Sequence, residues 1–346
     1  MNAKRFFAVV LVAAAVVLGV AAAFVAWTDP LMRGGLADGE TALFINQRYE
    51  EPGLIRSQDY SAVVMGTSLV ANYRASWFTE GLGEKTLKIT FPDGWISEFD
   101  TALDLAFSTH PDLDKVFFGL DPNILVRSDS ERTVELPKYL YNNNPLDDVE
   151  FYLNADSVVL AAKTLAARAN GTGTDLDSAY LLQAEFSKKN AIFGYPRPEV
   201  SDTVLPEDAF RAACDENLAV VKSWLEEHPD TEFTIWFPPY SILYWDKMTR
   251  EGRADAIIWA VEYATEQLLQ YDNVKVHCFL IDYNTILTLA QYADHVHAST
   301  VVTERMTQYL LEGKFRFTEE NYQLRLDELR EFVANYDYDK VFESLW

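Results

Sequence analysis

The sequence predicts an α/β fold: a three-layer, doubly wound parallel sheet with helices on both faces, behind an N-terminal transmembrane helix. Three observations predict it. Short apolar runs that end at glycine or proline alternate with longer segments whose apolar residues recur at helical spacing. Apolar residues make up 49% of the 346-residue chain, which is enough for a sizeable core and too much for a disordered protein. An uncharged apolar run also occupies the N-terminus.

The strand signals are short runs without polar alternation, which is typical of strands buried on both faces of a parallel sheet. The predicted strands cover residues 61–65, 87–91, 116–118, 233–237 and 274–279. The predicted helices between and after them cover residues 96–108, 209–227, 254–269 and 300–311. This rhythm places one domain at 58–312. We interpret 125–205 as a helical insertion in that domain, packed near its site, and 313–346 as a helical tail.

The N-terminal segment has the pattern of an export signal or anchor. Lys4 and Arg5 precede an uncharged run of 22 residues, Phe6 to Trp27, and a bilayer-spanning helix needs about 20. The basic pair places the N-terminus in the cytoplasm and the acidic remainder outside. We expect residues 1–28 to form an uncleaved single-pass anchor in the cell membrane, followed by a juxtamembrane segment at 29–57. A cleaved signal peptide with a site near residues 21–23 is the alternative.

The charge and the cysteine count exclude several classes of protein. The net charge of −24 argues against a nucleic-acid binder, because phosphate backbones select basic patches. The acidity also makes a strongly anionic polymer an unfavourable substrate. Two cysteines exclude a disulfide scaffold. Cys214 and Cys278 either pair in the oxidising exterior or remain buried thiols, and the sequence leaves both possibilities open.

Ser68 is the first candidate functional residue. It ends the block Gly66-Thr67-Ser68 directly after the first predicted strand, and we expect a helix from Leu69. Functional groups collect at the carboxyl ends of the strands in such sheets. A serine at a tight strand-to-helix turn exposes its hydroxyl, beside backbone N–H groups that can bind an oxyanion. The plainer alternative is a helix N-cap.

A serine nucleophile needs a base, and the loop before the last predicted helix offers one. His297 lies three residues after Asp294, so the carboxylate can orient the imidazole from within one turn. Two alternatives remain for this loop. Asp294, His295 and His297 are also competent metal ligands, although no further His or Cys cluster completes such a site, and we expect neither a metal nor a cofactor. The loop could also be purely structural.

Together, Gly66-Thr67-Ser68 and Asp294-His295-Val296-His297 resemble the motifs of the SGNH (GDSL-like) serine hydrolases, over roughly residues 58–312. Threonine at position 67 resembles the membrane-anchored branch that contains the teichoic-acid D-alanylation and alginate-acetylation proteins. The resemblance implies a catalytic triad of Ser68, His297 and Asp294. It also implies an oxyanion hole built from the Ser68 backbone, Gly94 and an asparagine after the third strand.

The third oxyanion block departs from the family pattern. Asp121 stands where the asparagine is expected, and an ionised carboxylate cannot donate a hydrogen bond. Either Asn123 takes the role through a shifted loop, or this donor is absent. The aromatic stretch after the fourth strand is a candidate acceptor groove for sugars, with packing as its alternative. Its candidate residues are Tyr240, Tyr244 and Trp245.

These features favour an enzyme. The expected activity is that of an extracytoplasmic serine acyl-esterase or O-acyltransferase, a hydrolase-like protein acting on a cell-envelope glycan or polymer. The alternative is a non-catalytic module of the same fold that docks or scaffolds a multipass envelope acyltransferase.

Overall fold

The computed structural model describes residues 2–37, 39–142, 144 and 146–343. The chain divides into two compact units, which are described separately. Unit 1 comprises residues 1–58 and 135–179, and unit 2 comprises residues 59–134 and 180–346.

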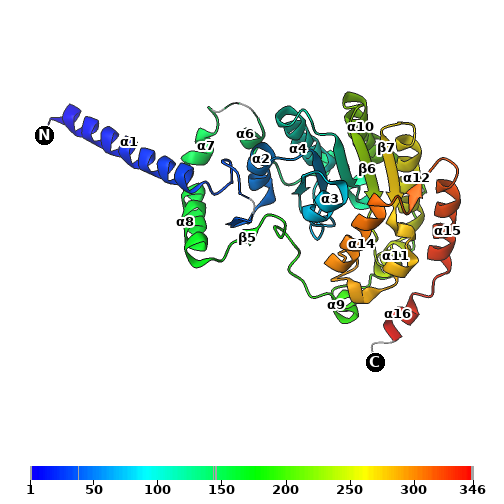
Figure 1. The fold of residues 1–346 in the computed structure, drawn as a ribbon. Helices are drawn as coiled ribbons and strands as arrows, with labels where there is room; N and C mark the ends of the chain where they lie inside the picture. Colours follow the sequence, from blue (N-terminus) through cyan, green and yellow to red (C-terminus); the bar gives the residue numbers. More distant parts are fainter. Residues whose placement is uncertain (1, 38, 143, 145, 344–346) are drawn as a thin grey trace. The chain divides into compact units, whose positions relative to one another are not determined.

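Unit 2 is built on a mostly parallel sheet (Figure 1). Its strand order is β3-β2-β4-β6-β7-β8. Its parallel strands are β2 (Ala62–Gly66), β3 (Thr86–Thr90), β4 (Lys115–Gly119), β6 (Glu232–Phe237) and β7 (Val274–Cys278). These confirm the predicted strands. The sequence did not predict the short antiparallel edge strand β8 (Arg316–Phe317), because a two-residue strand has no periodicity.

Helices cover both faces of the sheet because neighbouring strand residues point to opposite sides. On β4, the Phe117 ring lies 4.8 Å from Phe78 of α3 (Ala75–Leu82), whereas the Phe118 ring lies 5.4 Å from Trp224 of α10 (Arg211–Glu227). Helices α3 and α14 (Thr300–Leu311) pack together on the first face. Helix α10 packs between α4 (Ile96–Thr109) and α12 (Ala254–Leu268) on the second.

Shorter elements complete unit 2. They are α5 (Pro122–Leu125), η1 (Asp129–Glu131), α9 (Lys188–Phe193), α11 (Ile242–Arg250), η2 (Phe279–Ile281), α13 (Tyr283–Ile286), η3 (Leu289–Gln291), α15 (Tyr322–Asn335) and α16 (Asp339–Glu343). In the tail, α15 packs along α12, and Arg330 forms an ion pair with Glu262. Cys214 and Cys278 are free and buried, and burial raises the pKa of each thiol to about 12. The structure therefore has buried thiols rather than a disulfide.

Unit 1 joins segments that are far apart in the sequence. Its elements are α1 (Ala3–Thr28), β1 (Thr41–Ala42), α2 (Gln47–Ser57), α6 (Lys138–Tyr141), α7 (Val149–Tyr152), α8 (Ala155–Asn170) and β5 (Thr174–Asp175). Strand β1 pairs with β5, and the Arg56 guanidinium donates to the carbonyl oxygens of Leu140 and Asn142, each at 2.6 Å. The segment expected as an insertion, 125–205, is thus divided: residues 135–179 fold with the juxtamembrane segment, whereas 125–134 and 180–205 fold with the sheet.

Helix α1 is 26 residues long and is apolar enough to anchor the protein in a membrane. A signal sequence would meet the same description. Residues 2–20 are exposed, and burial begins at Ala21, where α1 meets α8.

Candidate active site

The candidate site lies where the strand order changes direction. The first parallel strand, β2, lies between the second (β3) and the third (β4). The connection that follows β2 and the connection that follows β4 therefore run over opposite faces of the sheet. Ligands bind in the crevice at this point in open α/β sheets. Ser68 follows β2, and Asp121 follows β4.

The turn that carries Ser68 differs from the expected strand-to-helix turn. Residues after Ser68 form turns, in which the Val70 N–H donates to Thr67 O at 2.9 Å and the Ala71 N–H donates to Ser68 O at 3.2 Å. The next helix, α3, begins only at Ala75, so no helix begins at Leu69. Val70 folds back over the strand end and fills the space that a side chain at position 66 would need. A Cβ on Gly66 would lie 2.4 Å from Val70 Cγ2, which explains the glycine.

The structure brings Ser68, His297 and Asp294 together in one hydrogen-bonded chain. The Ser68 hydroxyl lies 2.8 Å from His297 Nε2, and His297 Nδ1 lies 2.7 Å from Asp294 Oδ2. Because Nδ1 faces a carboxylate, it carries the ring proton, so Nε2 accepts from the serine hydroxyl. This is the order of groups that activates a serine nucleophile.

Backbone contacts fix the His297 loop. Asp294 Oδ1 accepts from the N–H groups of Val296 and His297, each at 2.8 Å. The Ala293 N–H donates to His297 O at 3.0 Å. Burial alone would raise the pKa of Asp294, but the hydrogen bonds and the charge interaction with His297 hold that pKa well below its usual range. The carboxyl is therefore ionised at neutral pH and available to stabilise an imidazolium.

Asn72 is a positioning residue that the sequence did not reveal. It is buried, its Nδ2 donates to Ala298 O at 2.7 Å, and its Oδ1 accepts from the Leu182 N–H at 2.9 Å. The Thr303 hydroxyl donates to Asn72 O at 2.7 Å. Asn72 thus ties the turn after Ser68 to the residue after His297. No sequence pattern around a single asparagine in a turn predicts a contact with residues distant in the chain.

The structure does not assemble the expected oxyanion hole. Across the described residues, no acceptor pairs with the Ser68 N–H, which leaves that donor available. The Gly94 N–H, by contrast, donates to Phe91 O at 3.0 Å inside a turn whose Asp93 has φ 49°. Arg127 holds the same turn by donating to Gly94 O at 3.2 Å. Gly94 serves the turn in this structure, and its N–H is not free for an oxyanion.

The third expected donor, Asn123, is committed to a buried polar network. Its Nδ2 donates to the Tyr240 hydroxyl at 2.7 Å, and its Oδ1 accepts from the Tyr244 hydroxyl at 3.1 Å. Asp121, buried at 7% exposure, accepts from the Asn123 N–H at 2.8 Å, from the Thr67 hydroxyl at 3.2 Å and from the Tyr240 hydroxyl. Asp121 therefore supports the nucleophile turn through Thr67 instead of facing an oxyanion.

The aromatic residues proposed as a sugar groove are buried. Tyr240, Tyr244 and Trp245 are at most 2% exposed, and the Tyr240 and Tyr244 ring centroids lie 3.9 Å apart. They offer no open ring face to a carbohydrate, so packing accounts for them. The two tyrosines hold Asn123 and Asp121.

The metal alternative receives no geometric support in the part of the chain that the structure describes. No group of three or more His, Cys, Asp or Glu side chains is arranged there to hold an ion. The His295 ring instead lies 5.9 Å from the ring of Tyr195.

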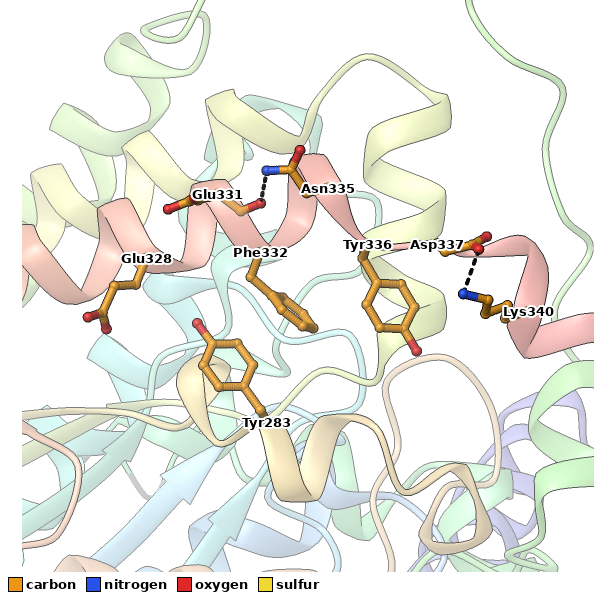
Figure 2. Close-up of a pocket in the computed structure, with 8 residues that line it drawn as sticks. All are labelled: Tyr283, Glu328, Glu331, Phe332, Asn335, Tyr336, Asp337 and Lys340. Atoms are coloured by element: carbon orange, nitrogen blue, oxygen red, sulfur yellow. Dashed lines mark hydrogen bonds and ion pairs between the residues drawn. The ribbon is translucent and has the colours of Figure 1, made fainter.

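A hollow of about 850 Å³ lies elsewhere in unit 2, where the rings of Tyr283, Phe332 and Tyr336 face it beside acidic side chains (Figure 2). None of its lining residues belongs to the Ser68 site.

Burial of Asp121 predicts a pH-dependent stability. Burial raises its pKa, against the opposing hydrogen bonds from Tyr240, Asn123 and Thr67. A carboxyl whose pKa is higher in the folded state than the unfolded value of about 3.9 binds its proton more tightly when the chain is folded. Its contribution to folding stability is complete below about pH 3.9 and is lost as the pH rises through the folded-state pKa. We expect the Tm of Asp121→Asn minus the Tm of wild type to increase as the pH rises from 4 to 8, because only the wild-type carboxyl titrates. Exposed Asp112→Asn is the control, and a Tm difference that is independent of pH for Asp121→Asn would contradict this prediction.

Comparisons with known proteins add distant structural similarity alone. No family model matches the chain, and no curated protein matches it. A solved structure from Streptococcus pneumonia, described as a platelet activating factor, covers 77% of this chain and 90% of its own at 12% identity, with a TM-score of 0.43. A similarity at this level does not bear on the chemistry of the Ser68 site.

Proposed function

We propose that this protein is a membrane-anchored serine acyl-esterase or O-acyltransferase of the SGNH type that acts outside the cytoplasm. One observation carries the proposal: the continuous hydrogen-bonded chain from the Ser68 hydroxyl through His297 to Asp294, at 2.8 and 2.7 Å. Its position at the carboxyl end of β2, where ligands bind in sheets of this topology, supports the same conclusion.

The proposed reaction is acyl transfer through a covalent intermediate. Ser68 Oγ attacks the carbonyl carbon of an ester while His297 Nε2 takes the hydroxyl proton. Asp294 holds the Nδ1–H and stabilises the imidazolium. When the tetrahedral intermediate collapses, the ester C–O bond breaks, and His297 returns the proton to the leaving alkoxide. Water or a carbohydrate hydroxyl then attacks the acyl-Ser68 ester while His297 takes its proton. The bond between the acyl carbon and Ser68 Oγ breaks, and His297 returns the proton to Oγ, which gives hydrolysis or transfer and restores the free serine.

The oxyanion donors set the expected speed of this reaction. The Ser68 N–H is available, while Gly94 and Asn123 are engaged elsewhere. Loss of one oxyanion donor costs about 10²–10³ in rate in a serine protease. The proposed enzyme is therefore slow with simple esters, unless substrate binding rearranges the Phe91–Gly94 turn.

The proposed substrate follows from the proposed location. A domain held outside the cytoplasm by α1 meets cell-wall polymers, capsular polysaccharide and lipid-linked glycans. The net charge of −24 disfavours a strongly anionic polymer. An uncharged or weakly charged envelope glycan that carries or accepts an O-acyl group fits best.

Fluorophosphonate labelling of the full-length protein in detergent tests the proposal. A fluorophosphonate phosphonylates only an activated serine, so wild type should label, and Ser68→Ala should lose all labelling while keeping the same Tm. Ser241→Ala is a matched control, because Ser241 is a buried serine whose hydroxyl donates to His295 O and has no imidazole partner. Labelling that persists in Ser68→Ala would overturn the assignment.

The second candidate function is a non-catalytic module that docks a multipass envelope acyltransferase. The engaged Gly94 N–H and the committed Asn123 side chain favour it, because they leave the oxyanion site incomplete. It requires that Ser68→Ala and His297→Ala fully complement a deletion strain. Loss of complementation by both folded variants would exclude it.

A further inference from the structure

Helix α8 has a continuous band of apolar residues on its outer face, flanked by the exposed Asp156, Lys163 and Asn170, although the chain as a whole is strongly acidic. The buried side of α8 is formed by Ser157, Ala161, Thr164 and Ala167. Residues at helical spacing on the opposite side are exposed or half-exposed. They are Val158, Val159, Ala162, Leu165, Ala166 and Ala169.

What covers this outer face can be inferred from where α8 packs along α1. Helix α8 packs against α1, whose covered residues begin at Ala21 and include Val25 and Thr28 (Figure 1). The Arg168 guanidinium donates to Thr28 O at 2.8 Å and so fixes α8 at the end of α1.

The lengths of the two parts of α1 then decide the depth of α8. The uncovered apolar part, residues 6–20, spans only about 22 Å at 1.5 Å per residue, whereas the hydrocarbon core is about 30 Å thick. The remaining thickness is reached only through residues 21–27, the stretch in which one side of α1 becomes covered and along which α8 packs. A helix held at that depth has its outer face in contact with lipid.

We infer that α8 lies in the outer interface of the membrane, with its apolar outer face against the acyl chains. This inference rests on the anchoring role proposed for α1. Two further features fit an interfacial helix. α8 carries one acidic residue against Lys163 and Arg168, a positive balance in a chain of net charge −24. Trp27, at the end of the apolar run, is 69% exposed, and tryptophan is enriched at membrane interfaces.

Fluorescence quenching in the full-length protein tests the inference. Both native cysteines are fully buried, so a thiol-reactive NBD probe labels only an introduced cysteine. The probe positions are Leu165→Cys and Ala162→Cys on the outer face of α8, Asp156→Cys on its polar flank and Val16→Cys in mid-α1. The labelled proteins are reconstituted into phosphatidylcholine–phosphatidylglycerol vesicles containing lipids with a nitroxide near the headgroup or near the bilayer centre.

We expect blue-shifted emission at Leu165 and Ala162, with headgroup-side quenching at least about twofold stronger than at Asp156, because lipid surrounds only the apolar face. Val16 should be quenched most by the nitroxide at the bilayer centre. Quenching at Val16 with a water-exposed probe at Leu165 would overturn the inference and leave the anchor standing. Loss of quenching at Val16 as well would overturn the anchor itself. A blue shift at Leu165 without lipid quenching would mean a protein occupant, such as a second copy, and would also overturn the inference.

Discussion

Replacing His297 with alanine is expected to lower kcat/KM for an aryl ester such as p-nitrophenyl acetate by about 10⁴–10⁶-fold, as loss of a triad residue does in serine proteases. His297 Nε2 is the acceptor 2.8 Å from the Ser68 hydroxyl, so without it the serine keeps its proton at neutral pH. Steady-state kinetics and the rate of fluorophosphonate labelling should fall together.

His295→Ala provides the matched control for this change. His295 lies two residues away in the same loop, where its backbone oxygen accepts from Ser241 and its ring lies 5.9 Å from that of Tyr195. Its removal should leave kcat/KM within about tenfold, since it makes no hydrogen bond to the reacting groups. If His295→Ala lost as much activity as His297→Ala at the same Tm, the assigned base would be wrong.

Asp294→Asn is expected to lower kcat by about 10⁴-fold with little change in KM, as the equivalent change does in a serine protease. The asparagine oxygen can still accept from the backbone N–H groups of Val296 and His297. Its amide nitrogen, however, is a donor that faces His297 Nδ1 and so favours the wrong tautomer, which places the ring proton on Nε2. Measurement of kcat and KM separately, together with circular dichroism melting, distinguishes this effect from unfolding.

Asn72→Ala and Asp294→Asn should affect the protein in different ways. Asn72 joins two chain segments, and its side-chain hydrogen bonds in the described structure go to Ala298 and Leu182, not to Ser68 Oγ or the His297 ring, so its loss should lower Tm as well as activity. If the Asp294→Asn variant had a normal Tm and a normal kcat, the proposed role of the Asp294 carboxylate in the reaction would be wrong.

The α/β architecture could be predicted because its information is local. An apolar run such as 61–65 without polar alternation is stable only when both faces are covered, and that requires helices on both sides of the sheet. Asp294 and His297 could be paired for a similar reason, since a spacing of three residues brings the side chains together within one turn. Their meeting with Ser68 followed from the topology, which gathers strand ends at one edge.

The departures all concern how a group is used once the chain has folded. The Gly94 N–H, the Asn123 amide and the rings of Tyr240 and Tyr244 are competent for the roles that the sequence suggested. In the folded chain, the Gly94 N–H is hydrogen-bonded within a turn, the Asn123 amide is hydrogen-bonded to tyrosine hydroxyls, and the two rings pack against each other. A donor can serve only one strong acceptor at a time, and the sequence does not state which acceptor comes within reach.

By itself, the sequence determined the α/β layout and the apolar N-terminal helix, and it selected Ser68, His297 and Asp294 as candidate residues, because periodicity, run length and short spacings specify these features locally. Only the tertiary structure decided that residues 29–58 fold with 135–179, that Asp121 faces inward to Thr67 and Tyr240, and that α8 packs on the end of α1. The physical reason is that these outcomes depend on burial and on competition among hydrogen-bond partners distant in the chain, which no local pattern records.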